Sequence, residues 1–323
     1  MSNLIAITIG DINGVGIEIV IKSWKKKKIK NFILFSNYSE IVKYIKKKKI
    51  NIKLNILNDD KKKLNFQKDK FNIYDYECNS SEENSFKSLK YAYKFCKKNI
   101  CYGMITLPLR KDLIKKISNR FIGHTEFFQK IDNKKYSNMI LFHKKIIVSP
   151  LTTHIKIKNI SKLITNKEFL YNQIMNLYKT MKIDFNFVTP RLVISGFNPH
   201  SGENGNIGNE ENNSIIPVLK KLRKKGVDID GPISADSMLI TKKIKKYDCY
   251  IFIFHDQALI PFKFISQFSG VNYTGNLNII RTSPDHGTAY DMVGSKYLSN
   301  ISFLNCFELI KKISINRKKN GKS

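Results

Sequence analysis

Three short apolar segments of the sequence each run into a polar stretch that contains a histidine. They are residues 250–254 before His255, residues 146–148 before His154, and residues 192–194 before His200. Runs of this length, rich in aromatic and β-branched residues, are typical of buried strands. Segments with a helical spacing of apolar residues separate them. Strands that alternate with helices predict a mostly parallel α/β protein.

The same patterns predict the other elements. We expect strands at residues 4–9, 31–35, 52–56 and 104–106, a hairpin of residues 138–142 with 145–149, and helices at residues 17–23, 40–47, 127–131, 166–183, 210–225 and 299–313. Residues 80–83 carry a start signal for a helix that ends near Lys98. His143 is interpreted as an exposed residue of the hairpin turn, and the tail from Asn316 is polar.

Length and composition limit the class of protein. A chain of 323 residues exceeds one comfortable core and predicts two domains. No stretch approaches the roughly 20 apolar residues of a membrane span, and the apolar start is too short for a secretory signal. The 5 cysteines form no Cys-x-x-Cys pair. This indicates idle or buried thiols in a reducing compartment, and we expect a cytoplasmic protein.

The formal net charge of +31 invites comparison with nucleic-acid-binding proteins. Of the 57 basic residues, however, only six are arginine, and the lysines are spread through nearly every predicted element. Arginine is the usual residue for bidentate recognition of bases and phosphates, and one basic face is the usual footprint. We therefore expect no specific nucleic-acid function, only weak, salt-sensitive binding to polyanions.

The three histidines share one topological position, because ligands of open α/β sheets bind beyond the carboxyl ends of the strands. His154, His200 and His255 lie in polar loops at such ends, so they can meet around one metal ion. Neutral imidazoles suit Zn²⁺ and other first-row ions, and three protein ligands leave a position open for substrate. Asp236 and Asp256 are candidates to orient a ligand or move a proton, and loop capping explains each of them as well.

A glycine turn, residues 10–16, joins the first predicted strand to the first helix. The amino terminus of that helix can receive an anion through its backbone N–H groups. The glycine spacing is not that of the dinucleotide-binding fingerprint. A tight turn without a ligand explains these residues equally well.

Several motifs occur in a fixed order along the chain. They are Gly-Asp with Gly-Val-Gly at residues 10–16, Gly-His-Thr-Glu at 123–126, Gly-Phe-Asn-Pro-His-Ser-Gly-Glu at 196–203, Gly-Pro with Ala-Asp at 231–236, His-Asp-Gln at 255–257 and Arg-Thr-Ser-Pro-Asp-His-Gly-Thr-Ala at 281–289. The ordered set, which extends from residue 4 to residue 294, resembles the 4-hydroxythreonine-4-phosphate dehydrogenases of vitamin B6 synthesis. The order of the motifs is far more specific than any single one.

The resemblance implies an α/β fold with two α/β/α domains, similar to the isocitrate and isopropylmalate dehydrogenases. We place the first domain at residues 1–120 with 285–323, and the second, with the metal histidines, at residues 121–284. The resemblance also implies a homodimer with shared active sites and a small phosphorylated amino acid as substrate. The implied reaction is NAD-dependent oxidation of 4-phosphooxy-L-threonine to 2-amino-3-oxo-4-phosphooxybutanoate, which decarboxylates to 3-amino-2-oxopropyl phosphate in pyridoxal phosphate biosynthesis.

Matched motif by motif, the resemblance assigns roles to individual residues. The divalent metal, Zn²⁺ with Mg²⁺ or Co²⁺ as alternatives, is bound by His154, His200 and His255. The substrate residues are His124, Thr125, Lys263, Asn272 and Arg281. The general base is not settled, and its candidates are Asp236, Asp256 and Lys111.

Residues 285–294 resemble the segment that holds adenosine in isopropylmalate dehydrogenases, which assigns the cofactor to His286 and Asp291. A carboxylate at this place accepts hydrogen bonds from a free ribose 2′-hydroxyl and repels a 2′-phosphate. The charge therefore favours NAD over NADP.

The chain departs from the family pattern at positions with special backbone properties. Ile12 and Ile17 stand where the family has prolines, and Leu107 stands where it has a glycine. The predicted ligands are unchanged. The alternative function is that of a related dehydrogenase for another phosphorylated hydroxy acid or a diol. A cationic binding protein that has lost catalysis is the rival from a different class.

Overall fold

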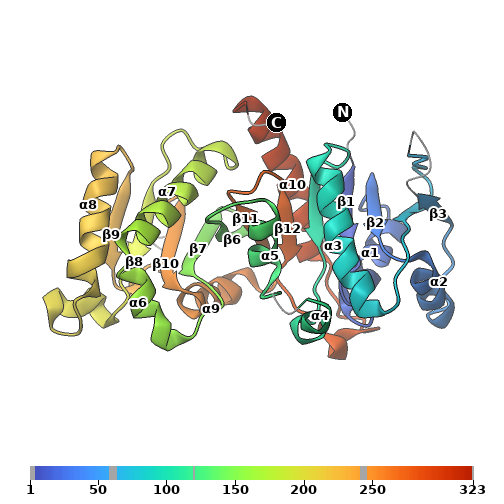
Figure 1. Ribbon diagram of the computed structural model, residues 1–323, viewed down its shortest axis with the longest axis horizontal. Coiled ribbons are helices and arrows are strands. Elements are labelled where there is room, and N and C mark those ends of the chain that lie inside the picture. Colours follow the sequence, from blue (N-terminus) through green and yellow to red (C-terminus); the bar gives the residue numbers. More distant parts are fainter. Residues whose placement is uncertain (1–3, 58–63, 119–120, 241–245, 322–323) are drawn as a thin grey trace. The chain divides into compact units, whose positions relative to one another are not determined.

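The structure is a computed structural model that describes residues 4–57, 64–118, 121–240 and 246–321. The chain divides into two compact units, Met1–Phe127 with Asn278–Ser314 and Phe128–Leu277 with Ile315–Ser323 (Figure 1). The domain boundaries of the sequence analysis stay predictions, because compactness alone does not show that a unit folds independently. None of the described helices is both long and apolar enough to cross a membrane.

The first unit is built on a parallel sheet. Its strands are β1 (Ile5–Thr8), β2 (Phe32–Phe35), β3 (Leu54–Leu57), β4 (Phe71–Tyr74), β5 (Gly103–Thr106) and β12 (Arg281–Pro284). They lie in the order β3-β4-β2-β1-β5-β12 with parallel neighbours. The helices that begin in this unit are α1 (Val15–Lys25), α2 (Tyr38–Lys47), α3 (Ser81–Lys97), α4 (Lys111–Ile117), α5 (His124–Ile131) and α10 (Ile301–Lys319).

The second unit is built on a mixed sheet. Its strands are β6 (Asn138–His143), β7 (Ile146–Thr152), β8 (Leu192–Ser195), β9 (Ile229–Ile233), β10 (Cys249–Phe254) and β11 (Val271–Gly275), in the order β11-β6-β7-β10-β8-β9. Strand β6 pairs antiparallel with β7 and β11, and the other pairs are parallel. The helices that begin here are α6 (Ile160–Ile164), α7 (Lys167–Ile183), α8 (Ile216–Lys224) and α9 (His255–Ser266).

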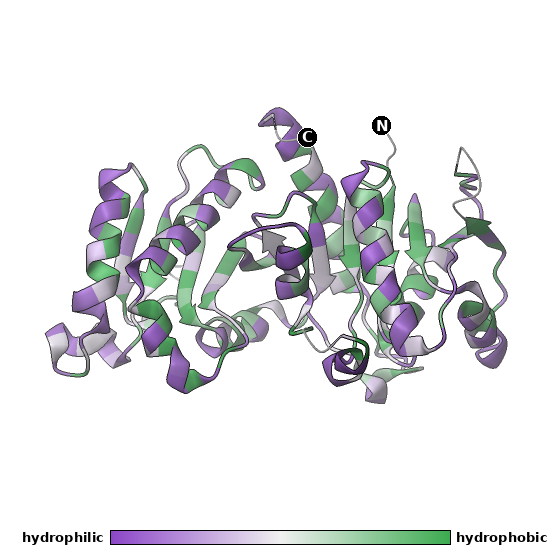
Figure 2. Ribbon diagram, viewed as in Figure 1, coloured by the Kyte–Doolittle hydropathy of each residue, from purple (hydrophilic) through white to green (hydrophobic). Residues whose placement is uncertain are grey.

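Burial explains why these segments become strands and helices. Every residue of β1, β2, β4 and β5 is buried, as expected for parallel strands that helices cover on both faces. Figure 2 shows strands that are largely hydrophobic and helices with hydrophobic and hydrophilic bands. The helix start predicted at Ser80 is confirmed, because the Ser80 hydroxyl accepts a hydrogen bond from the Glu83 N–H at 3.1 Å. The mostly parallel α/β arrangement and the hairpin are confirmed as well.

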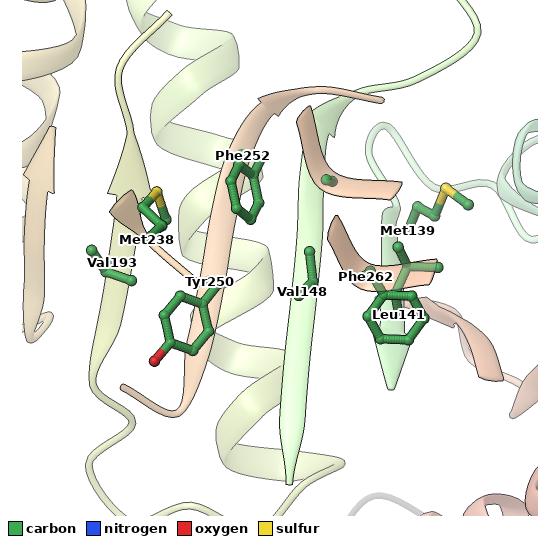
Figure 3. Close-up of a cluster of buried hydrophobic side chains, with 9 residues drawn as sticks. Met139, Leu141, Val148, Val193, Met238, Tyr250, Phe252 and Phe262 are labelled. Atoms are coloured by element: carbon green, nitrogen blue, oxygen red, sulfur yellow. The ribbon is translucent and has the colours of Figure 1, made fainter. Parts of the chain in front are cut away.

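One apolar cluster holds the strands that lead to the predicted metal ligands. Tyr250 and Phe252 of β10 belong to it, together with Val148 of β7, Val193 of β8 and Phe262 of α9 (Figure 3). Strands β7, β8 and β10 are the three segments from which the sequence analysis began. The core of the second unit therefore fixes the points at which the histidine segments start.

Some local predictions are wrong. His143 is not an exposed turn residue, because it is buried in β6 with its Nδ1 3.0 Å from Ser269 Oγ. The stretch after residue 254 is not a loop, since α9 begins at His255 itself. The final helix continues beyond residue 313 to Lys319. Strands β4, β9, β11 and β12 were not predicted, because they are short and carry polar residues, glycine or proline.

A buried ion pair explains the length of the final helix. Arg317 is 4% exposed, Asp184 is 1% exposed, and Arg317 Nε donates to Asp184 Oδ1 at 2.7 Å. The Tyr273 hydroxyl donates to Asp184 Oδ2 at 2.5 Å and accepts from Arg317 Nη2 at 3.0 Å. Both charges are thus paired and hydrogen-bonded, which is the condition under which buried ions are tolerated.

Removal of one member of this network should destabilise the protein strongly. Asp184→Ala leaves the Arg317 guanidinium buried without its counter-charge, and we expect the free energy of unfolding to fall by about 3–5 kcal/mol. Glu168→Ala is the control, because its pair with Lys135 is exposed (68% and 71%) and contributes at most about 1 kcal/mol. Urea denaturation measures both. Equal stability of the two variants would contradict this account of the final helix.

Candidate active site

His154 and His255 are brought together by two neighbouring strands. Strands β7 and β10 are parallel, and their register places Thr152 opposite Phe254, just before the two histidines. Thr152 Oγ1 donates to Ile253 O at 2.9 Å and ties the strand ends together. The centroids of the two imidazole rings lie 5.8 Å apart.

This separation suits two ligands of one metal ion. With a Zn–N distance of about 2.1 Å, the centre of a ligating ring lies roughly 3 Å from the ion, so two such rings lie at most roughly 6 Å apart. Asp256 Oδ1 lies 2.6 Å from His255 Nδ1. A carboxylate in this place fixes the tautomer of a ligating histidine and leaves Nε2 for the metal. His154, His255 and Asp256 line a pocket of about 170 Å³ together with Thr153 and Ile157.

His200 lies in a left-handed turn after β8. Residues 200–204 all have φ between 42° and 81°, and Gly202 is the only glycine among them. Left-handed backbone costs roughly 1–2 kcal/mol for each residue other than glycine. Such a segment persists only where its surroundings hold it, and such segments cluster at functional sites.

The structure brings two of the three predicted metal ligands together. Within the described part of the chain there is no group of three His, Cys, Asp or Glu side chains placed to hold a metal ion. His154 and His255 form a pair, and His200 follows β8, which is the other neighbour of β10. The three-histidine site stays a prediction, and the pair supports it.

The three candidates for the general base lie in different elements. Asp236 is exposed in a short turn, Ala235–Ser237, which contacts the His200 segment. Asp256 is exposed in the first turn of α9. Lys111 is exposed at the start of α4 in the first unit. The choice among the three stays open.

Arg281 and His124 form a buried cationic site in the first unit. Arg281 is 1% exposed, and its Nε donates to Thr106 Oγ1 at 3.0 Å. Burial lowers the pKa of the guanidinium to about 10, so the group stays charged at neutral pH. His124 Nε2 is shielded from solvent and has no hydrogen-bond partner among the described residues. An anionic, hydrogen-bonding ligand would satisfy both groups.

The other predicted substrate residues are shielded in part. Thr125 is buried next to His124 in the first turn of α5. In the second unit, Lys263 lies on α9 with its Nζ 5.6 Å from the centroid of the Phe268 ring. Asn272 lies on β11, and its Oδ1 is shielded without a hydrogen-bond partner in the described part of the chain.

The predicted cofactor segment packs on the first glycine turn. Val15 N donates to Thr288 O at 3.0 Å, so this amide at the amino terminus of α1 is engaged by the protein. Gly294 N donates to Glu18 Oε2 at 2.9 Å. Burial lowers the pKa of His286, whose Nε2 is shielded and without a hydrogen-bond partner among the described residues. Asp291 is exposed.

Sequence reasoning gave no role to Thr106, Asn198 and Glu211. Glu211 is 2% exposed and accepts hydrogen bonds from the backbone N–H groups of Phe197 and Asn198, both at 2.8 Å. The available signal was a pair of acidic residues, 210 and 211, at the start of a predicted helix. An acidic pair at a helix start is common, so spacing alone could not reveal that Glu211 is buried.

Comparisons with known proteins agree with the motif order. Residues 28–310 match the family model of the pyridoxal phosphate biosynthetic protein PdxA. The chain is 35% identical over 318 residues to a 4-hydroxythreonine-4-phosphate dehydrogenase of Sulfurihydrogenibium sp. (strain YO3AOP1), which covers 94% of this chain and 96% of that protein. It is similar to the crystal structure of a 4-hydroxythreonine-4-phosphate dehydrogenase from Klebsiella pneumoniae, with a TM-score of 0.82 at 26% identity and coverage of 97% and 98%.

The fold extends beyond these relatives. An isocitrate dehydrogenase from Methylococcus capsulatus has a TM-score of 0.50 at 10% identity, with 99% of this chain and 89% of that chain covered. The predicted fold class, an α/β protein similar to the isocitrate and isopropylmalate dehydrogenases, is confirmed.

The His124 environment predicts a pH-dependent stability. Burial lowers the pKa of His124 well below its usual value, and the charges of Arg281 and Lys111 lower it further. The unfolded chain therefore takes up a proton below about pH 6.5 that the folded chain refuses, and stability falls as the pH falls. Between pH 6.5 and 5 this loss reaches at most about 2 kcal/mol.

Denaturation at both pH values checks this prediction. His124→Asn should lose less stability than the unmodified chain as the pH falls from 7 to 5. Equal losses in the two proteins would show that His124 is not held neutral.

Proposed function

Because this chain belongs to the PdxA family of pyridoxal phosphate biosynthetic proteins, we propose that it is a metal- and NAD-dependent 4-hydroxythreonine-4-phosphate dehydrogenase. It oxidises the secondary hydroxyl of 4-phosphooxy-L-threonine to a ketone, with the hydride transferred to NAD and the hydroxyl proton to a protein group. The product, 2-amino-3-oxo-4-phosphooxybutanoate, is a β-keto acid that loses CO₂ to give 3-amino-2-oxopropyl phosphate. A cytoplasmic location is part of the proposal.

The buried guanidinium of Arg281 is the observation that carries this function. Its hydrogen-bond partner Thr106 is neutral, so a phosphate or carboxylate of the substrate would supply negative charge to it through a forked contact. The neutral His124 imidazole can donate or accept at its shielded Nε2 without adding charge. Thr125, Lys263 and Asn272 complete the proposed substrate residues.

His154, His200 and His255 are proposed to hold the divalent metal, which is Zn²⁺ with Mg²⁺ or Co²⁺ as alternatives. A bound ion would supply positive charge that lowers the pKa of the substrate hydroxyl. The pairing of His154 with His255 and the contact of Asp256 with His255 Nδ1 support this set. The group that takes the hydroxyl proton is proposed to be Asp236, Asp256 or Lys111.

His286 and Asp291 are proposed to bind NAD, whose nicotinamide would accept the hydride. His286 has a shielded nitrogen available for a ligand, and Asp291 is exposed. The Tyr290 hydroxyl donates to Asp11 of the glycine turn, which holds the segment against that turn. This arrangement leaves the Asp291 carboxylate accessible to a ribose.

A homodimer is the proposed active form, and an apolar stripe on α9 supports it. Ile260, Phe264 and the nearby Phe268 are 69%, 85% and 60% exposed. Their spacing of four residues puts them on one side of the helix. Contiguous exposed apolar residues mark interaction surfaces. Lys263 lies on the same helix, so a partner that covers the stripe would also border a proposed substrate residue.

Formation of NADH tests the proposed reaction. We expect the purified protein to reduce NAD with 4-phosphooxy-L-threonine, and the activity to disappear with a chelator and return with Zn²⁺, Mg²⁺ or Co²⁺. Arg281→Lys keeps the charge but loses the fork, and we expect kcat/KM to fall by about 10–100-fold, mainly through KM. Absence of turnover with every metal would exclude the reaction, and faster turnover of erythronate or threonate phosphates would favour the alternative dehydrogenase.

Cofactor preference is tested by kcat/KM for NAD and NADP. We expect a preference for NAD of at least about tenfold, which corresponds to about 1.4 kcal/mol. Asp291→Asn should reduce it, because an amide does not repel a 2′-phosphate. Glu308→Gln, which removes an exposed carboxylate of α10, is the control and should leave the preference unchanged. Equal use of NADP by the unmodified protein would refute the role of Asp291.

Sedimentation tests the dimer. The unmodified protein should sediment at twice the 37.5 kDa of one chain. Phe264→Glu should yield monomers, because it places a charge in the apolar stripe. Val188→Glu is the matched control, since Val188 and Phe264 are both 85% exposed and Val188 lies outside the stripe. A fully active monomer, or a Phe264→Glu dimer, would exclude this interface.

A further inference from the structure

We propose that Glu211 is a positioning residue that holds the left-handed turn and thereby sets the place of the His200 imidazole. This inference rests on the proposed function, because it assigns His200 to the metal. Glu211 itself is not a proposed ligand. It lies 11 positions further along the chain, in the π-helical turn Glu211–Ile215 that precedes α8.

The carboxylate of Glu211 collects the donors at the entrance of the turn. Its Oε1 accepts from the Phe197 and Asn198 N–H groups, each at 2.8 Å, and its Oε2 accepts from Asn198 Nδ2 at 2.9 Å. Asn198 precedes the turn Pro199–Gly205 by one residue. The backbone and the side chain of Asn198 are therefore both fixed by one buried carboxylate.

Glu211 also packs against the turn itself. A Cβ atom at Gly202 would lie 2.8 Å from Glu211 Oε2, so no larger residue fits there without displacing the carboxylate. The Asn198 side chain bonds to Glu210 Oε2 at 2.9 Å as well, and Glu210 Oε1 accepts from Ser161 Oγ at 2.8 Å. The turn is thus held from two helices, and Glu211 is the group in contact with both its entrance and its middle.

The chemistry of the contacts requires an ionised carboxylate. All three neighbours are donors, and only a carboxylate accepts at both of its oxygens. A glutamine at this position would direct its NH₂ group toward a donor, at either Asn198 Nδ2 or the two backbone N–H groups. The substitution Glu211→Gln keeps the size of the side chain and removes one acceptor, so it should shift the turn without opening a cavity.

Metal affinity separates positioning from a general structural role. A displaced ligand weakens metal binding, and loss of an outer group that orients a ligand typically costs 10–100-fold in affinity. Because the three histidines remain, saturating metal should restore kcat in Glu211→Gln. A residue that only stabilises the fold would lower the unfolding temperature and leave the metal affinity of the folded protein unchanged.

Equilibrium dialysis of the purified full-length protein against Co²⁺ provides the test. We expect Glu211→Gln to weaken Co²⁺ binding by about 10–100-fold. Glu203→Gln is the control, because Glu203 is an exposed carboxylate on the same turn, and it should keep the wild-type affinity. His200→Ala is measured beside them and should also lose affinity.

The outcomes are distinct. Weaker binding by His200→Ala and Glu211→Gln, with Glu203→Gln unchanged, supports the inference. Wild-type affinity of Glu211→Gln beside a weakened His200→Ala overturns the role of Glu211 and leaves the proposed function intact. Wild-type affinity of His200→Ala overturns the proposed metal site and this inference with it.

Discussion

The parallel pairing of β7 with β10 is the contact on which the candidate site depends. Parallel strands end at the same edge of a sheet, so His154 and His255 meet although about a hundred residues separate them. The apolar cluster around Tyr250 and Phe252 fixes that pairing from below the site. A slip of one residue would turn each side chain to the opposite face. The imidazole pair would then be lost together with the core.

The distribution of the cations follows the same division between core and surface. Lysine serves nearly everywhere on this chain, but the buried positions Arg281 and Arg317 are arginines. A guanidinium is more weakly hydrated than an ammonium and offers a planar fork of donors, so it is easier to bury. Arg317 uses the fork on Asp184, and Arg281 presents its charge beside His124. The lysine excess therefore says little about either site.

The sequence predicts what depends on local pattern and misses what depends on distant contacts. The apolar runs before His154 and His255 are strands, and the pair that follows them is real. The length of α10 could not be predicted, because the partner of Arg317 lies 133 positions away at Asp184. The burial of Glu211 is similar, since nothing in an acidic pair at a helix start distinguishes a buried carboxylate from a solvated one. Motif order identified the family where spacing alone left alternatives.

The left-handed turn also bears on how this chain can change with time. Glycine adopts such a backbone without strain, so replacement of Ser201, Glu203 or Asn204 by glycine would relieve strain and add stability to the folded state. The same replacements would widen the range of backbone conformations open to the segment that carries His200. Mutations that benefit the fold here would therefore harm the site, a trade-off between robustness and activity. Selection for function, and not for stability, would keep side chains at these positions.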